Sequence, residues 1–155
     1  MRHVPAGGMW HKAADQLRGT SVYGDPCGAT CATEWSTKFD DTNFNQFLFA
    51  TGDLQKWLIA DKDVVTGSYY ANEPRLIIKS SSNPTSYRAR WYRRLGASED
   101  PWVSLTDHGQ AIGEGNILYG ENHFGSGHAN NVLPKHEGAN VFIRYSGKCY
   151  FYILL

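Results

Sequence analysis

Short apolar segments alternate with turn-forming residues through the second half of the chain. The segments are RLIIKSS, SYRARWYRRL, PWVSL, NILYG, NVFIRYS and CYFYILL, and NP, EDP, GEG, GSG and SGK lie between them. Apolar runs of this length, bounded by Gly, Pro, Asn and Asp, are typical of strands joined by turns. A series of such runs predicts an all-β domain, an antiparallel β-sandwich or barrel.

A hairpin is expected just before this series. Two apolar runs, 47–50 and 57–60, flank the sequence TGDLQK, in which the Gly-Asp pair is a turn signal. The sequence DLQKWLIADK also fits one or two helical turns, because a short apolar run does not by itself distinguish a strand from a helix. The pattern favours two strands and leaves the helical alternative open.

The N-terminal region follows a different period. Residues 9–18, MWHKAADQLR, place Trp10, Ala13, Ala14 and Leu17 at helical spacing, and Gly19 follows as a stop signal. This spacing predicts a short amphipathic helix packed against the β-domain. Residues 20–33 are small, polar and turn-forming, and we expect an irregular loop there.

We expect a single domain over residues 1–155, because no linker, internal repeat or low-complexity tract interrupts the chain. A chain of this length buries roughly 70% of the surface of its unfolded form, which is enough for a normal core. The final segment, CYFYILL, is apolar on both faces. An exposed strand of this kind would template aggregation, so we expect it inside the domain or at a subunit contact.

Charge excludes some classes of partner. Fifteen basic and fifteen acidic residues balance, so the overall field attracts neither nucleic acid nor an anionic membrane. No run approaches the roughly 20 apolar residues of a membrane helix, and the first residues lack the apolar core of a signal peptide. We expect no nucleic acid and no membrane insertion, and we interpret the chain as a soluble extracellular protein.

Three cysteines leave the disulfide framework open. Cys27 and Cys31 are close in sequence, and Cys149 lies near the other end. One bridge with a spare thiol and three free thiols are both permitted. We favour a bridge from the Cys27–Cys31 pair to Cys149, which would tie the N-terminal segment to the last strand. A zinc site that combines these cysteines with a histidine is a further alternative.

The segment SYRARWYRRL predicts a strand with a basic face. Strand alternation separates its side chains into two sets: Arg88, Arg90, Tyr92 and Arg94 on one face, and Tyr87, Ala89, Trp91, Arg93 and Leu95 on the other. Arginine forks bind carboxylate, sulfate or phosphate, so this face is a candidate docking strip for an anionic glycan. The alternative is a solvated face whose arginines pair with Glu73, Glu99 or Asp100.

The stretch from Trp102 to Arg144 holds the main candidates for a binding site. Apolar pieces alternate with glycine-bent polar loops, which is where binding residues concentrate. Sugar recognition uses planar amide and carboxylate groups together with an aromatic ring in a concave site. The candidate ligand-binding residues are Trp102, Asp107, His108, Tyr119, Glu121, Asn122 and Asn130, with Phe124 and Asn131 beside them. Tryptophans such as Trp91 and Trp102 nevertheless pack in cores more often than they contact ligands.

Histidines in the same stretch suggest a metal as a second interpretation. His123, His128 and His136 are candidate ligands for zinc, while the nearby acids suit calcium. A metal-dependent hydrolase would also need a general base, for which Glu121 or Glu137 could serve. No rigid spacing such as HExxH enforces a site. A third interpretation gives the histidines turn-capping roles in a self-assembling matrix protein.

Weighing these alternatives, we expect non-enzymatic recognition of a carbohydrate by the loops between Asp107 and Glu137. The module would be extracellular and part of a homo-oligomer, because several copies multiply a weak single-site affinity. The alternatives remain a metal-dependent hydrolase and a structural, self-assembling protein.

Overall fold

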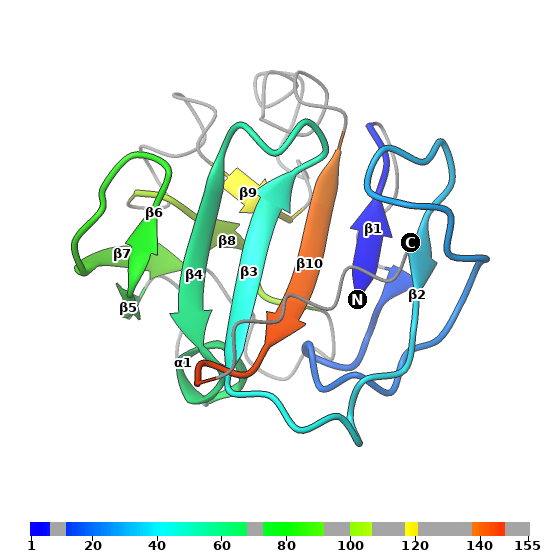
Figure 1. Cartoon of the computed structure of the whole chain (residues 1–155), viewed down its shortest axis with the longest axis horizontal. Helices are drawn as coiled ribbons and strands as arrows, with labels where there is room; N and C mark the ends of the chain where they lie inside the picture. Colours follow the sequence, from blue (N-terminus) through cyan, green and yellow to red (C-terminus); the bar gives the residue numbers. More distant parts are fainter. Residues whose placement is uncertain (7–11, 68–72, 92–99, 107–116, 121–137, 148–155) are drawn as a thin grey trace.

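The computed structural model describes residues 1–6, 12–67, 73–91, 100–106, 117–120 and 138–147. Short strands dominate these residues (Figure 1). The elements are β1 (Arg2–Val4), β2 (Trp35–Ser36), β3 (Gln46–Thr51), β4 (Trp57–Asp61), α1 (Lys62–Thr66), β5 (Glu73–Ile77), β6 (Lys79–Ser80), β7 (Tyr87–Trp91), β8 (Val103–Ser104), β9 (Ile117–Tyr119) and β10 (Ala139–Arg144).

The largest sheet has six strands in the order β2-β1-β10-β3-β4-β6, and its ladders are antiparallel. The expected hairpin forms its centre: Leu48 of β3 lies opposite Ile59 of β4. Its turn is closed by a hydrogen bond from the Thr51 amide to the Lys56 carbonyl (2.9 Å). The two strands are confirmed, and a helix begins only at Lys62, after β4 has ended.

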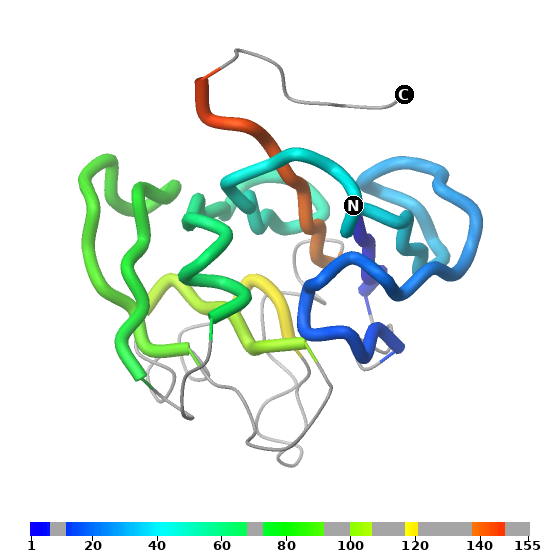
Figure 2. The backbone as a smooth tube through the Cα atoms, turned by 90° about the horizontal axis from the view of Figure 1, so that it is seen from below, coloured from blue at the N-terminus to red at the C-terminus, as the bar shows by residue number. Residues whose placement is uncertain are grey.

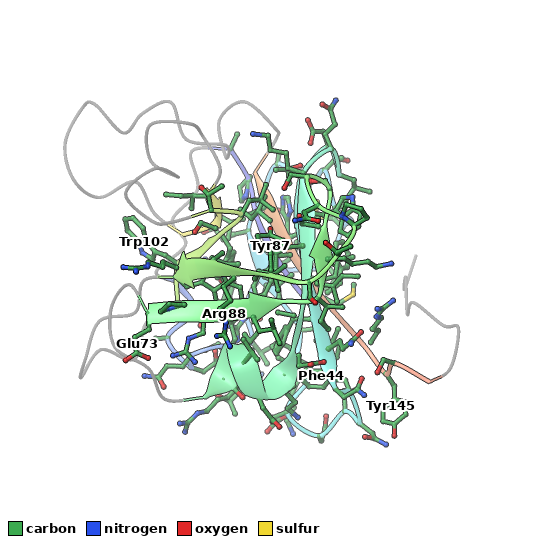
Figure 3. All side chains as sticks on the ribbon, turned by 90° about the vertical axis from the view of Figure 1, so that its left-hand side faces the viewer. Phe44, Glu73, Tyr87, Arg88, Trp102 and Tyr145 are labelled. Atoms are coloured by element: carbon green, nitrogen blue, oxygen red, sulfur yellow. A yellow bond between two sulfur atoms is a disulfide. The ribbon has the colours of Figure 1, made fainter. Side chains whose placement is uncertain are left out.

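Two smaller sheets, β5-β7 and β8-β9, lie on one side of the six-stranded sheet (Figure 2). The segment RLIIKSS supplies strands to both layers: β5 pairs with β7, whereas β6 pairs with β4. The change of sheet occurs at Ile78, whose amide donates to the Ile59 carbonyl (2.8 Å). Viewed from the side, β5 and β7 run across the direction of β3 and β4 (Figure 3). The all-β class and antiparallel pairing are confirmed, and a closed sandwich or barrel stays a prediction.

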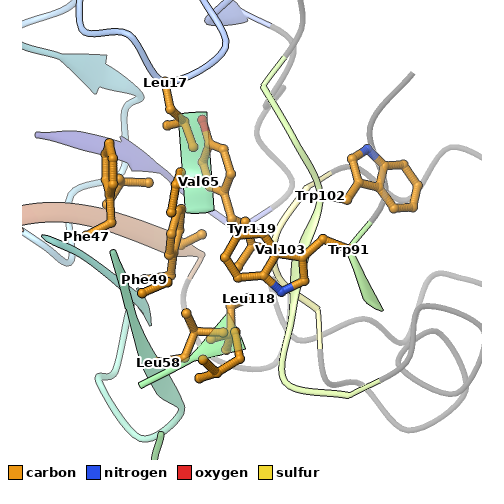
Figure 4. Close-up of a cluster of buried hydrophobic side chains, with 14 of the residues drawn as sticks. Leu17, Phe47, Phe49, Leu58, Val65, Trp91, Trp102, Val103, Leu118 and Tyr119 are labelled. Atoms are coloured by element: carbon orange, nitrogen blue, oxygen red, sulfur yellow. The ribbon is translucent and has the colours of Figure 1, made fainter. Parts of the chain in front are cut away.

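The core lies between these layers and is rich in aromatic rings (Figure 4). The ring centroid of Phe49 on β3 lies 6.0 Å from that of Trp91 and 6.0 Å from that of Tyr119. Phe47 contacts Phe49 on the same strand at 5.8 Å. Complete burial of each such side chain contributes about 1.5–3 kcal/mol. The inward residues of β3 therefore join the large sheet to β7 and β9.

The predicted N-terminal helix is wrong for residues 12–18, which form turns and bends; residues 9–11 lie outside the described part of the chain. Gln16 and Leu17 have positive φ angles of 57° and 59°, which a right-handed helix excludes. Asp15 accepts hydrogen bonds from the amides of Gly19, Thr20 and Ser21 at 2.6–2.9 Å. Such local bonds compete with helix formation. Burial follows the pattern in part: Ala13 and Leu17 are enclosed, whereas Ala14 is exposed.

Two strands near the N-terminus were not expected. β1 pairs with β10 on one side and with β2 on the other. Neither β1 nor β2 is long enough to show a period in sequence, and their partners lie far away along the chain. The final segment, CYFYILL, lies outside the described residues, and its interior placement stays a prediction. No helix among the described residues is long and apolar enough to cross a membrane.

Gly138 offers a test of the β1–β10 contact. Its φ is +96°, and a Cβ there would collide with the Val4 carbonyl oxygen. Gly28 has a similar φ of +104°, but a Cβ there would meet nothing within 4 Å. We expect Gly28→Ala to lower the free energy of unfolding by about 1–2 kcal/mol, the cost of the left-handed backbone. Gly138→Ala should cost more, because the collision adds to that strain.

Urea unfolding of both variants measures this difference. Equal losses in the two proteins would show that the close approach of Gly138 to β1 does not constrain the fold.

Candidate functional site

Most of the predicted site residues lie outside the described part of the chain. This holds for Asp107, His108, Glu121, Asn122 and Asn130, for Phe124 and Asn131, and for His123, His128 and His136. The convergence of these loops into one sugar or metal site therefore stays a prediction. Two members of the set, Trp102 and Tyr119, are described, and both belong to the core.

Trp102 is 5% exposed and Tyr119 is fully enclosed. A Cβ on Gly120 would lie 2.9 Å from Cγ of Trp102, so the glycine allows the backbone to approach the indole closely. Figure 4 places Tyr119 beside Phe49, with Trp102 at the margin of the cluster. Neither ring offers an open face on which a sugar could stack. For Trp102 and Trp91 the expectation of core packing is confirmed, and the Trp91 indole donates to the Ser104 carbonyl (3.0 Å).

The Tyr119 hydroxyl leads to a buried charge cluster, which we define as Arg2, Asp15, Asp100 and Tyr119. The Arg2 guanidinium donates to Asp100 Oδ2 (2.7 Å) and to Asp15 Oδ2 (2.6 Å). The Tyr119 hydroxyl donates to Asp100 Oδ2 at 2.6 Å. Asp100 also accepts the Leu17 amide at 2.9 Å. The cluster joins β1, the turn around Asp15, the start of the 100–106 segment and β9.

Burial and charge act in opposite directions on the two carboxyl groups. Burial raises the pKa of Asp100 to about 6, although Arg2, Tyr119 and the Leu17 amide each lower it. Burial would also raise the pKa of Asp15, but Arg2 and the amides of Ser21 and Thr20 lower it to about 2. Two carboxylates share one guanidinium, so the fully ionised cluster carries an excess negative charge. Protonation of Asp100 removes that excess.

The arginine pattern on β7 is confirmed where it is described. Arg88 and Arg90 are exposed, whereas Ala89 and Trp91 are fully buried. Opposite them on β5 lie Leu76, across from Arg88, and Pro74, across from Arg90. Both β5 residues are also exposed. We call this surface, made of Arg88, Arg90, Pro74 and Leu76, the arginine face; Figure 3 shows Arg88 on it.

Two of the acids expected to pair with these arginines have other partners among the described residues. Asp100 is wrong as a partner, because it is buried and binds Arg2. Glu73 forms an ion pair with Arg75 (2.8 Å), which belongs to β5. Within the described residues no ion pair involves Arg88. Glu99, Tyr92, Arg93, Arg94 and Leu95 lie outside these residues.

A disulfide joins Cys27 to Cys31, with their Cα atoms 5.7 Å apart. The expected bridge to Cys149 is therefore wrong, because both members of the pair are already bonded to each other. The zinc alternative that used their thiolates is wrong for the same reason. The turn between them brings the two residues within disulfide distance. A disulfide indicates that the protein matures in an oxidising environment.

Among the residues that the structure places, no group of three or more His, Cys, Asp or Glu side chains is arranged to hold a metal. An open hollow lies beside the disulfide and is lined by Pro5, Ala6, Thr30, Cys31 and Ala32. These five lining residues have small side chains, and none of them is charged.

Comparison with known proteins gives no match: no family model, no curated protein and no solved structure is significantly similar to the chain.

Sequence reasoning missed the buried charge cluster. Arg2 occupies a strand too short to show alternation, and Asp15 was assigned to a helix. Asp100 lies in the turn sequence EDP, and the sequence suggests it only as an alternative partner for the arginines of SYRARWYRRL. No local signal relates these residues, because they are separated by 13 and 98 positions along the chain.

The raised pKa of Asp100 predicts a pH-dependent stability. The folded protein binds this proton more tightly than the unfolded chain, in which the carboxyl has its ordinary pKa of 3.8. The contribution of Asp100 to the free energy of unfolding is therefore largest below pH 4 and declines as pH rises to about 6. Asp100→Asn cannot lose a proton, so the stability difference between wild type and variant should shrink as pH rises from 4 to 7.

Asp15→Asn is the matched control, because its pKa is lowered to about 2. The ionised Asp15 carboxylate stabilises the fold above pH 4 and loses that effect as pH falls towards 2, so the stability lost in Asp15→Asn should grow between pH 2 and 4 and stay level from there to pH 7. Urea unfolding at each pH measures both. A constant difference for Asp100→Asn between pH 4 and 7 would show that Asp100 does not take up the proton.

Proposed function

We propose that the protein is a non-catalytic carbohydrate-recognition module that binds an acidic glycan on its arginine face. The observation that supports this most is the exposure of Arg88 and Arg90 on the same face of one strand. Guanidinium groups bind carboxylate and sulfate through paired hydrogen bonds and remain charged at all physiological pH values. A glycan that carries uronic acid or sulfate groups matches this chemistry.

The rest of the arginine face suits a sugar rather than an isolated anion. Leu76 lies opposite Arg88 and is 41% exposed, and Pro74 lies opposite Arg90. These apolar side chains can contact the C–H surface of a pyranose while the arginines bind its acidic groups. Residues two apart on a strand are separated by about 6.4–6.8 Å. The two arginine side chains therefore leave the strand at separate points, which suits binding to separate acidic groups along a glycan chain.

The strand beneath the arginines is held firmly. Ala89 and Trp91 alternate with the arginines and lie in the core, and the Trp91 indole donates to the Ser104 carbonyl (3.0 Å). A rigid platform lowers the entropic cost of binding. Two exposed arginines still give only a modest, salt-sensitive affinity. We therefore propose that a homo-oligomer presents several arginine faces to one polymeric glycan.

The Cys27–Cys31 disulfide supports an extracellular setting for this module, since such bonds persist in oxidising compartments. The loops with Asp107, Glu121 and Asn122 remain part of the proposal as additional contacts to uncharged hydroxyl groups.

Removing the arginine charges tests the proposal. We expect Arg88→Gln with Arg90→Gln to weaken binding to dextran sulfate at least tenfold in 50 mM salt, because both forks are lost. Arg18→Gln with Lys38→Gln changes the net charge equally at exposed positions outside the arginine face. This control should leave binding within about twofold. Surface plasmon resonance on immobilised dextran sulfate measures both.

A further pair of variants and a second ligand distinguish glycan recognition from simple attraction between charges. Arg88→Lys with Arg90→Lys keeps the charge but loses the planar fork, so it should bind several-fold more weakly than wild type. Uncharged dextran should not bind. Equal binding by the wild type, the Gln pair and the control pair would exclude the arginine face as the site.

A further inference from the structure

His3 is buried on the opposite face of β1 from Arg2, and both of its ring nitrogens face oxygen atoms. Nδ1 lies 2.9 Å from Oδ1 of Asn140, and Nε2 lies 2.8 Å from the carbonyl oxygen of Cys31. The side chain is completely enclosed. The hydrogen-bond partners therefore indicate whether each ring nitrogen carries a proton.

The orientation of the Asn140 amide is fixed by two other carbonyl groups. Its Nδ2 donates to the Ala29 carbonyl at 3.1 Å and lies 3.4 Å from the Thr51 carbonyl. The reverse orientation would place the amide oxygen against two oxygens that cannot donate. Asn140 Oδ1 must therefore face His3, and it accepts from Nδ1–H.

The second ring nitrogen, Nε2, must also donate a hydrogen bond. A backbone carbonyl such as that of Cys31 can only accept, so Nε2 must also carry a proton. A neutral imidazole has one N–H, and it would leave a lone pair facing an oxygen at less than 3 Å. The imidazolium form satisfies both contacts, and it is the only protonation state that does so.

Within the part of the chain that the structure describes, the groups that contact the imidazole carry no positive charge. The Trp35 ring stacks on the imidazole with a centroid separation of 6.3 Å and an interplanar angle of 29°. The electron-rich face of the indole suits a cation. Cys31 is disulfide-bonded and does not titrate, and Asn140 is uncharged. The Arg2 guanidinium, from the neighbouring position on β1, binds Asp15 and Asp100.

These contacts hold residues 27–31, which we call the disulfide loop. Three of its carbonyls accept side-chain hydrogen bonds: Gly28 from Trp35 (3.2 Å), Ala29 from Asn140, and Cys31 from His3. The donors come from β2, β10 and β1 respectively. Because the Cys27–Cys31 bond closes the loop, a change at one contact is passed to the others. The loop also forms one wall of the hollow beside Pro5.

We propose that His3 is a proton-operated clasp for the disulfide loop. The imidazolium fixes the loop against β1 and β10. Loss of one ring proton breaks one of its two hydrogen bonds, loosens the loop and changes the shape of the hollow next to it. This device is independent of glycan binding at the arginine face.

Nuclear magnetic resonance on the wild-type protein tests the clasp directly. The ¹⁵N shifts of the His3 ring report its protonation, and hydrogen exchange of the Trp35 indole N–H, which bonds to Gly28, reports loop closure. We expect both ring nitrogens to carry protons where the indole is protected. As pH rises, the indole protection factor should fall at least tenfold with the same midpoint as the His3 titration.

His3→Gln supplies the comparison, because glutamine donates a hydrogen bond but does not titrate in this range. Its Trp35 protection should show no such midpoint. A singly protonated His3 ring at every pH at which the protein is folded would overturn the proposal. So would an indole protection factor that stays constant while His3 titrates. Both of these outcomes are read from the wild type, so the test stands even where the variant fails to fold.

Discussion

One guanidinium, that of Arg2, joins β1 to the turn at Asp15, to Ser36 of β2 and to the segment at Asp100. It donates to Asp100, Asp15 and Ser36, and its charged carbon lies 5.2 Å from the centre of the Phe39 ring. Removal of one partner from a buried ion pair costs about 3–5 kcal/mol, because the other charge is left unpaired. The short strand β1 therefore depends on this side chain as much as on its backbone ladder, and the turn at Asp15 and the segment at Asp100 are positioned by it.

The two faces of β1 have separate roles. Arg2 points towards the two-layer core, where Asp100 accepts hydrogen bonds from both Arg2 and Tyr119. His3 points the other way and contacts the disulfide loop. Both side chains are enclosed, and both lie within hydrogen-bond distance of oxygen atoms. A three-residue strand thus places a guanidinium and an imidazole on opposite sides of the same sheet. Alternation along a strand makes this separation possible.

The arginine face is exposed because of the change of sheet at Ile78. Strand β5 leaves the large sheet and pairs with β7, so the inward face of β7 packs on Phe49 through Trp91. Its other face is then left to solvent, with Arg88 and Arg90 on it. Two acids near in sequence have other partners among the described residues, since Asp100 binds Arg2 in the core and Glu73 pairs with Arg75. The Arg2–Asp100 ion pair in the core thus removes one possible partner from the exposed arginines of β7.

Local pattern determined the all-β class, the hairpin at 46–61, most of the later strands and the alternation on β7. These features depend on the two-residue period and on turn residues, which act over short distances. It also identified Ala13, Leu17, Trp91 and Trp102 as apolar positions to be buried, although the helix expected around Leu17 did not form because Asp15 bonds the following amides instead. Only the tertiary structure decided the partners of Arg2, His3 and Asp100, the Cys27–Cys31 bond and the burial of Tyr119. Those contacts join residues up to 137 positions apart, and no periodic signal encodes them.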